Sequence, residues 1–270
     1  MDNNKFLIEN IFEAAIKGAK LSEKDSQTLR NAISNEIRKK PFRVAIIGQS
    51  GVGKTSTLNA VFGLNGYVAD IAEGTTQIEE KIFPMGDGFN LAIYDMPGLN
   101  NDVEKDMEYE QLYRSILPDC DVIIYIVNAH SKDIGEDCRI LKEVVLPICQ
   151  KGDTLRNLIL AINKIDTIGE SMDPNDPELR WDYINNVPTP KLKECIRVKL
   201  NAISDRLVSE NLVGGEDSID VEKIVFYSAV FNYNLGEFLI AITKTPRGIF
   251  WAGTVGPERL GKWSDMLLNK

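Results

Sequence analysis

The sequence is poor in the side chains that build metal centres and disulfides. It has one histidine, His130, and four cysteines that are scattered rather than paired at the spacing of metal ligands. A structural zinc site therefore has few candidate ligands. We expect four free thiols and assign the protein to a reducing cytoplasm. The cysteines are Cys120, Cys138, Cys149 and Cys195.

Long apolar runs and excess positive charge are also missing. No uncharged apolar run of about 18 residues occurs, which argues against an integral membrane protein, and the first residues lack the pattern of a signal peptide. The 31 Lys+Arg residues against 40 Asp+Glu give a formal net charge of -9. Such a surface repels phosphate backbones, so a nucleic-acid partner is disfavoured, although a local basic patch stays open.

What the chain does have is 43% hydrophobic residues, arranged with two different periods. Apolar runs of strand length occur at 42–47, 78–83, 91–94, 122–127, 158–162 and 224–227, and helical patterns at 54–62, 104–117, 138–149, 191–207 and 235–242. This alternation predicts an α/β fold with a mostly parallel central sheet and helices on both faces. A hairpin turn at Gly86-Asp87-Gly88 adds one antiparallel edge strand.

The same hydrophobic periodicity, together with the positions of prolines, divides the chain into three parts. Helical spacing over residues 1–40, ended by Pro41, predicts an N-terminal helical extension, and residues 41–246 form the main domain. Residues 247–270 have no pattern that indicates a structure. Residues 169–190 are rich in prolines and acids, and we expect them to be a loop or insertion without regular structure.

A phosphate-binding loop follows the first strand. Residues 48–55 match G-x-x-x-x-G-K-[ST] between a buried strand and a helix, which is the context that this motif requires. Glycines let backbone N–H groups surround phosphates, Lys54 neutralises the β/γ oxygens, and Thr55 offers a hydroxyl to Mg²⁺. The predicted nucleotide-binding residues here are Gly48, Gln49, Ser50, Gly51, Val52, Gly53, Lys54, Thr55 and Ser56.

Three further motifs stand at the carboxyl ends of later strands. Asp95 is placed to hold Mg²⁺ through a coordinated water, and Gly98 leaves room for a backbone N–H near the γ-phosphate. Asp166 can accept the N1–H and N2–H₂ donors of guanine, which adenine does not offer in that arrangement. Asn163 is expected to tie its loop to the phosphate loop, and the Lys164 stem to lie over the base. Backbone N–H groups of Ser228, Ala229 and Val230 are candidates for guanine O6.

Together with Gly74-Thr75-Thr76, which lies between the first two motifs, these motifs occur in the order found in TRAFAC-class GTPases, and the chain resembles that class. It is most similar to the Era/TrmE-like branch and to the bacterial GTPases described as ribosome-binding. The resemblance covers residue 41 to about residue 245. It implies a P-loop NTPase G domain that takes GTP or GDP with Mg²⁺. It also implies that Thr76 closes over the γ-phosphate and binds Mg²⁺, with Thr75 as the alternative, and that Lys54, Thr76 and Gly98 act in hydrolysis.

Two positions bear on how far the resemblance extends. Leu99 stands where Ras-like enzymes have a water-positioning glutamine; Era/TrmE-like proteins share such an apolar residue, which implies slow intrinsic hydrolysis. Gly51 stands where many Era/TrmE-like proteins have an asparagine linked to potassium activation. The resemblance therefore does not imply that this protein depends on potassium. His130 follows a strand at the ligand-binding edge, and we read it as a solvated loop residue rather than a catalytic one.

We therefore expect a GTPase of low intrinsic rate that acts as a switch. Its loops around Thr76 and after Asp95 would be read by a protein effector or a second copy of the chain. Two alternatives stay open: a dynamin-like or immunity-related GTPase that dimerises on GTP at membranes, and a hydrolysis-deficient GTP-sensing scaffold. The few lysines of the helix at 6–19 make it a poor binder of anionic membranes, which weakens the first alternative.

Overall fold

The structure is a computed structural model that describes residues 22–25, 27–28, 31, 40–62, 80–86, 89–98, 103–215 and 217–248. Several predicted features lie outside these residues: Thr75, Thr76, Leu99, the turn residues Asp87 and Gly88, most of the N-terminal extension and nearly all of the C-terminal segment. Within the extension, residues 23–25 are helical. In the described part of the chain, no helix has the length and apolar character needed to cross a membrane.

The described strands form one six-stranded sheet and a separate two-stranded ribbon. The order in the large sheet is β2-β3-β1-β4-β5-β8, parallel throughout except for the antiparallel pairing of β2 with β3 at one edge. The predicted fold class is confirmed, including the single antiparallel edge. The bounds are β1 Phe42–Ile47, β2 Glu80–Gly86, β3 Phe89–Asp95, β4 Val122–Asn128, β5 Leu158–Asn163 and β8 Ile224–Phe226.

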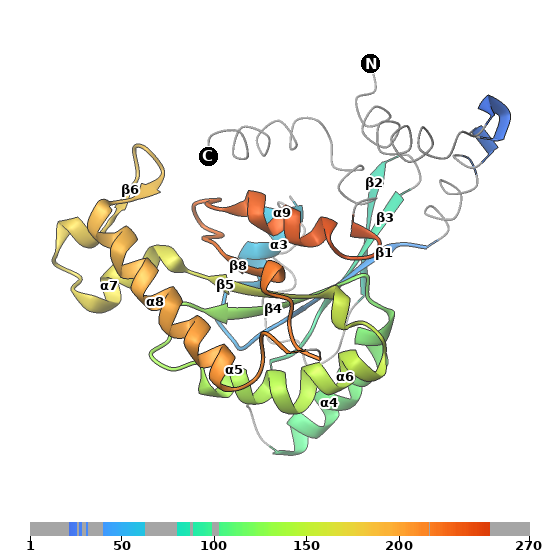
Figure 1. Ribbon diagram of the computed structural model, residues 1–270, viewed down its shortest axis with the longest axis horizontal. Helices are drawn as coiled ribbons and strands as arrows, with labels where there is room; N and C mark the ends of the chain where they lie inside the picture. The colour runs from blue at the N-terminus through green and yellow to red at the C-terminus, as the bar shows by residue number, and fades with distance from the viewer. Residues whose placement is uncertain are drawn as a thin grey trace.

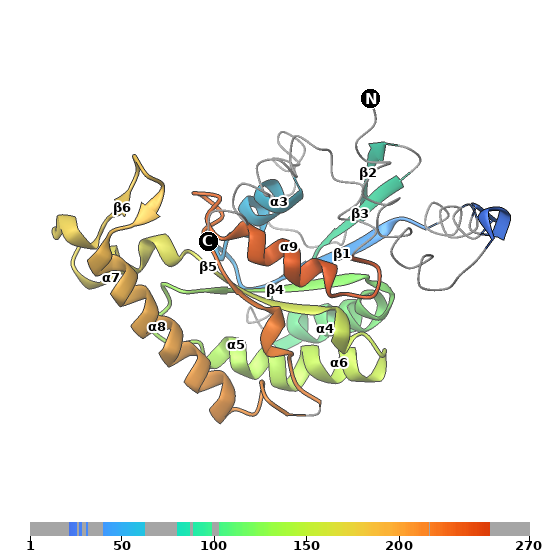
Figure 2. The ribbon, with the colours of Figure 1, turned by 45° about the horizontal axis from the view of Figure 1, so that its top comes forward.

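Helices cover both faces of the large sheet (Figure 1). On one face lie α3 (Lys54–Phe62) and α9 (Leu235–Thr243), which contact each other. On the other lie α4 (Val103–Ile116) and a continuous helix made of α5 (Gly135–Ile140), a π-helical stretch (Leu141–Val145) and α6 (Leu146–Lys151). The long helix α8 (Pro190–Ser209) packs on that same side, and Figure 2 shows this layering from a second direction.

Burial on both faces explains why the central strands read as nearly continuous apolar runs. In β1, Val44 and Ile46 enter the core under α3 and α9, whereas Ala45 and Ile47 enter the core under the helices of the opposite face. All four side chains are buried. A strand covered on both sides has no solvent-facing positions, so the alternation of a one-sided strand is absent.

The prediction that residues 169–190 lack regular structure was wrong. They carry most of α7 (Ile168–Met172), a 3-10 turn (Pro177–Leu179) and the antiparallel ribbon of β6 (Trp181–Asp182) and β7 (Val187–Pro188). The strands have two residues each, too few for a periodic signal. Their stability comes from the buried Trp181, which packs on residues about 50 positions further along the chain.

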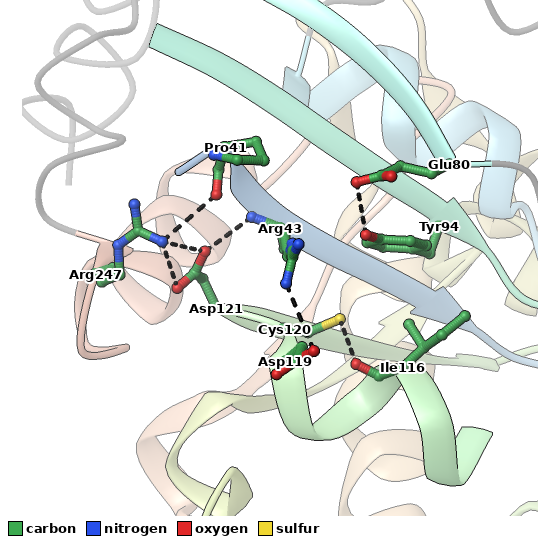
Figure 3. Close-up of polar contacts among 9 residues, drawn as sticks. All are labelled: Pro41, Arg43, Glu80, Tyr94, Ile116, Asp119, Cys120, Asp121 and Arg247. Atoms are coloured by element: carbon green, nitrogen blue, oxygen red, sulfur yellow. Dashed lines mark hydrogen bonds and ion pairs between the residues drawn. The ribbon is translucent and has the colours of Figure 1, made fainter. Parts of the chain in front are cut away.

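At the edge of the sheet away from the carboxyl ends of the parallel strands, a charged contact joins distant segments (Figure 3). The guanidinium of Arg247 donates to both carboxylate oxygens of Asp121, at 3.0 and 2.9 Å, and to the Lys40 carbonyl at 3.2 Å. Asp121 also accepts the N–H of Arg43 at 2.8 Å. The segment after α9 is thereby fixed, through Arg247, to the start of β1 and the start of β4.

Candidate functional site

The phosphate-binding loop runs from the end of β1 to the start of α3, as its motif predicts. Two of its glycines have conformations and surroundings that a side chain does not fit. Gly53 has φ +96°, and a Cβ there would lie 2.4 Å from Asn163 Nδ2. Gly48 has φ +147°, and its Cβ would lie 2.6 Å from the Ile126 carbonyl oxygen. The loop therefore packs closely against the neighbouring strands β4 and β5, in a shape that depends on glycine.

Lys54 opens α3 and turns back over the loop. Its Nζ donates to the carbonyl oxygens of Gly48 at 3.1 Å and Gln49 at 3.4 Å. Burial lowers the pKa of this ammonium, and the nearby Asp95 carboxylate opposes that shift. Two carbonyl oxygens do not fully replace the hydration that a half-buried ammonium has lost. An anion bound at this position would therefore be favoured electrostatically.

Asp95 ends β3 beside the phosphate loop and is 7% exposed. Burial raises the pKa of its carboxyl to about 6, against the opposing effect of Lys54. Its Oδ1 is buried, and no other described residue donates a hydrogen bond to it. A buried carboxylate oxygen in this state is a suitable acceptor for a cation or for water bound to one. The donor set next to the phosphate loop thus fits Mg²⁺.

Two contacts hold the Asp95 segment in place. Met96 N–H donates to the Ile46 carbonyl at 3.0 Å, which extends the pairing of β3 with β1. The buried Tyr113 hydroxyl of α4 donates to the Pro97 carbonyl at 2.6 Å. Gly98 approaches the phosphate loop so closely that a Cβ would lie 3.2 Å from the Gly48 carbonyl oxygen. The motif after β3 and the loop after β1 therefore form one packed unit.

Asn163 links the phosphate loop to the turn after β8. Its Nδ2 donates to the Val52 carbonyl at 3.0 Å, and its Oδ1 accepts the Ala229 N–H at 3.1 Å. The residue is 2% exposed, so both bonds are shielded from water. The tie to the phosphate loop that the sequence predicted is present, and one side chain also fixes the third segment of the site.

Asp166 lies in a 3-10 turn (Ile165–Thr167) directly after β5. The preceding residue, Lys164, has the left-handed φ of 65°, which turns the chain sharply at the end of the strand. Asp166 Oδ1 is buried without a hydrogen-bond partner among the described residues. A carboxylate oxygen held this way lacks compensation for the water it has lost, and a ligand carrying N–H donors would supply it.

Residues 228–233 form a tight turn between β8 and α9, closed by bonds in both directions between Ser228 and Tyr233. The amides of Ser228 and Ala229 already donate within the protein, to the Tyr233 carbonyl and to Asn163 Oδ1. Val230 is 70% exposed. Of the three amides suggested by the sequence, that of Val230 is the one for which the described part of the chain provides no acceptor.

Several positioning residues were not found from the sequence. Thr57 and Tyr227 join α3 to the residue after β8 through their hydroxyls, 2.6 Å apart. Asp137, buried at the start of α5, accepts hydrogen bonds from the Gln49 side chain and from the Tyr125 hydroxyl. A tyrosine in an apolar strand is the usable signal in both cases, because a buried phenol hydroxyl requires a partner. The partner itself cannot be read from spacing.

The exposed His130 contacts the Thr167 carbonyl oxygen at 3.2 Å, in agreement with its reading as a surface loop residue. All four cysteines are free. Within the described ranges, no three His, Cys, Asp or Glu side chains converge on a common metal position. Mg²⁺ does not require such a cluster, since it is commonly bound by one or two carboxylates with phosphates and water.

Comparison with known proteins agrees with this geometry. Residues 43–164 match the family model described as "50S ribosome-binding GTPase". The tRNA modification GTPase MnmE of Acetivibrio thermocellus is 29% identical over 213 residues, and GTPase Der of Leptospira interrogans is 26% identical over 175 residues. The chain contains a TRAFAC-class P-loop GTPase domain of the Era/TrmE-like type.

The alignments of this GTPase domain cover part of each relative. They include 75% of this chain and 41% of MnmE, and 61% of this chain and 34% of Der. The uncharacterized protein YfjP of Escherichia coli (strain K12) is 32% identical over 103 residues, which is 36% of its own length. Among solved structures, Era of Aquifex aeolicus bound to GDP·AlF4⁻ aligns with a TM-score of 0.49 and 19% identity, over 75% of this chain and 56% of Era.

Proposed function

We propose that this protein binds GTP and GDP with Mg²⁺ and hydrolyses GTP slowly, as a nucleotide-dependent switch. The observation that carries the proposal is the buried Asp166 Oδ1, which has no hydrogen-bond partner among the described residues, in a loop that Asn163 joins to the phosphate-binding loop. A P-loop alone is compatible with any nucleoside triphosphate. A carboxylate fixed relative to that loop supports a base that presents two N–H donors, and guanine is that base.

At the phosphate end, we assign binding to the backbone amides of the loop, to Lys54 and to the positive end of α3. Thr55 and Asp95 would hold Mg²⁺, Thr55 through its hydroxyl and Asp95 through a bound water. When bound, the ion neutralises charge on the β- and γ-phosphates. A cation bound here would stabilise the ionised Asp95 carboxylate against the burial that raises its pKa.

At the base end, the Asp166 carboxylate would accept the N1–H and N2–H₂ groups of guanine. The geometry of the turn after β8 favours the exposed Val230 amide for O6, because the Ser228 and Ala229 amides already donate elsewhere. Adenine would leave Asp166 unpaired and would bring an amino group to the O6 position. The cost of leaving such groups unpaired in a buried site gives a strong preference for guanine.

The slow rate follows from Leu99, which cannot orient a water molecule through a hydrogen bond. Thr76 and the segment after Asp95 would respond to the γ-phosphate, and a protein effector or a second copy would recognise that response. The net charge of -9 gives no electrostatic support to a nucleic-acid partner. The four free cysteines are consistent with action in the cytoplasm.

The direct test is nucleotide binding by the full chain. Titrations with GDP, GTP, ADP and ATP, each with and without Mg²⁺, should give tight binding for the guanine nucleotides alone. Steady-state phosphate release should be measurable and slow, with a turnover rate of about 10⁻³ per second or less in the absence of a partner. Equal affinity for adenine and guanine nucleotides would refute the proposal, and phosphate release at the background rate would remove its catalytic part.

A further inference from the structure

The ribbon of β6 and β7 lies beside the turn between β8 and α9, as Figures 1 and 2 both show. This ribbon belongs to the segment that follows Asp166, whereas the turn contains the residues assigned to guanine O6. The two segments are about 50 residues apart in sequence. Their contact is therefore a tertiary feature of this fold, formed between segments that are distant in sequence.

An aromatic contact forms the centre of this junction. Trp181 of β6 is 4% exposed and stacks on Phe231 of the turn, with ring centroids 4.8 Å apart and planes at 17°. Tyr233 meets the same indole edge-on at 5.0 Å, and Tyr183 meets Phe231 at 5.5 Å. Rings with few rotatable bonds, packed in this way, restrict the positions that the turn can adopt.

A single amide group completes the junction. Asn186 Oδ1 accepts the Trp181 Nε1–H at 3.2 Å, and Asn186 Nδ2 donates to the Phe231 carbonyl at 2.9 Å. The residue has the left-handed φ of 54°, which asparagine and glycine adopt more readily than other residues. Asn186 thus joins the ring on the ribbon to the backbone of the turn, in addition to the stacking.

The same segment is fixed to the other side of the base site. It leaves β5 through Asp166 and enters α7, whose Ile168 and Gly169 are buried. A Cβ at Gly169 would lie 1.9 Å from the Leu179 carbonyl oxygen, so α7 is in close contact with the 3-10 turn that precedes β6. One short, packed segment therefore connects the Asp166 loop to the turn at 228–233.

We propose that the β6–β7 ribbon positions the guanine-binding turn, with Trp181 and Asn186 as positioning residues for base recognition. This inference rests on the proposed function, because it assumes that the turn meets guanine. The ribbon holds the Val230 amide at a fixed distance from Asp166, so that both edges of the base are met at once. Without the ribbon, the turn keeps its Ser228–Tyr233 pairing and the bond from Ala229 to Asn163, but Phe231 and the Val230 amide beside it lose the contacts that restrict their position.

The test compares GDP with ADP, which share phosphates and ribose and differ in the base. Trp181→Ala should weaken GDP binding about tenfold and leave ADP binding unchanged, so the preference for GDP narrows. Asn186→Gly keeps access to the left-handed backbone and removes the amide, and it should have a smaller effect in the same direction. Trp181→Phe should recover most of the preference, because a ring can still stack on Phe231.

Ile184→Ser is the matched control, since Ile184 lies in the same ribbon and is 94% exposed. It should leave both affinities unchanged. The inference is overturned if Trp181→Ala and Asn186→Gly are folded and keep the wild-type ratio of GDP to ADP affinity, or if both affinities fall equally. Should Trp181→Ala fail to fold, Asn186→Gly decides alone. A wild-type protein without a preference for GDP would instead refute the proposed function, and the inference with it.

Discussion

Thr57 Oγ1 and Tyr227 Oη lie 2.6 Å apart in the core between α3 and the end of β8. Thr57 also donates its hydroxyl hydrogen to the Gly53 carbonyl at 2.8 Å, so Tyr227 must be the donor in the pair. The phosphate loop and the turn assigned to the base are thus joined through this hydroxyl contact as well as through Asn163. Hydrogen bonds made by side chains therefore connect the loops of the site to one another.

Tyr227→Phe should lower the free energy of unfolding by about 1 kcal/mol, because it removes the donor and leaves Thr57 with one bond fewer. Urea unfolding measures this loss. In a double-mutant cycle with Thr57→Val, the two changes should be clearly non-additive, since both remove the same bond. Additive losses would show that the two hydroxyls do not interact.

Lys54→Ala should abolish binding of GDP and GTP without lowering the stability of the nucleotide-free protein. Burial of the ammonium is unfavourable by itself, as its lowered pKa indicates, so its removal has little cost in the absence of phosphates. Titration and thermal unfolding together check this outcome. The exposed Lys132, changed to alanine, is the control for loss of one positive charge. Micromolar GDP affinity retained in Lys54→Ala would contradict the site assignment.

Asp137→Asn should change how stability depends on pH. Burial raises the pKa of the Asp137 carboxyl, and the hydrogen bonds from Gln49 and Tyr125 oppose this only in part. The folded protein therefore holds this proton more tightly than the unfolded chain, whose carboxyl has a pKa of about 4. Ionisation of Asp137 thus lowers stability as the pH rises from the unfolded pKa through the folded pKa.

The asparagine variant lacks that ionisation, so its stability relative to wild type should improve as the pH rises above about 4, the pKa of the unfolded carboxyl. Urea unfolding at a series of pH values measures the difference. Asp205→Asn, at an exposed position of α8, should follow the wild-type profile. A difference between Asp137→Asn and wild type that stays constant across this range would refute the assignment.

Arg247→Ala should destabilise the protein by about 2 kcal/mol, because it leaves the mostly buried Asp121 carboxylate with fewer donors. The side chains of this pair are 29% and 12% exposed. Adding Asp121→Asn should restore part of the loss, since the uncompensated charge is then removed. Arg197→Ala breaks an exposed pair with Glu194 and should have no measurable effect. Equal effects of Arg197→Ala and Arg247→Ala would contradict this account.

The features that could be predicted from the sequence are those that local pattern determines. β1 and α3 have the predicted bounds, because a two-sided apolar run and a glycine-rich loop before a helix are specified by neighbouring residues. The helix expected from residue 138 starts at Gly135, where Ile134 and Asp137 are buried by tertiary contacts. The β6–β7 ribbon was missed because Trp181 is stabilised by Phe231, a partner that no short window contains.

The residues of the candidate site also fall into those that the sequence could predict and those that it could not. The places of Asn163, Lys54 and Asp95 in the fold could be predicted, because each ends a strand or begins a helix at a fixed place in the motif order. Thr57 and Tyr227 were missed because their contact depends on the distance between α3 and β8 in the folded sheet. The choice of the Val230 amide over its two neighbours also required hydrogen-bond partners from β5 and from the far side of the turn.

The central claim is that the Asp166 carboxylate selects the guanine base, and nucleotide preference of Asp166→Asn tests it most directly. An amide supplies a donor where the carboxylate could only accept, and xanthine has a carbonyl where guanine has its amino group. The variant should therefore lose GDP affinity and gain affinity for XDP, measured by titration of both nucleotides with Mg²⁺ against wild type. An unchanged preference for GDP over XDP in a folded Asp166→Asn protein would contradict the account.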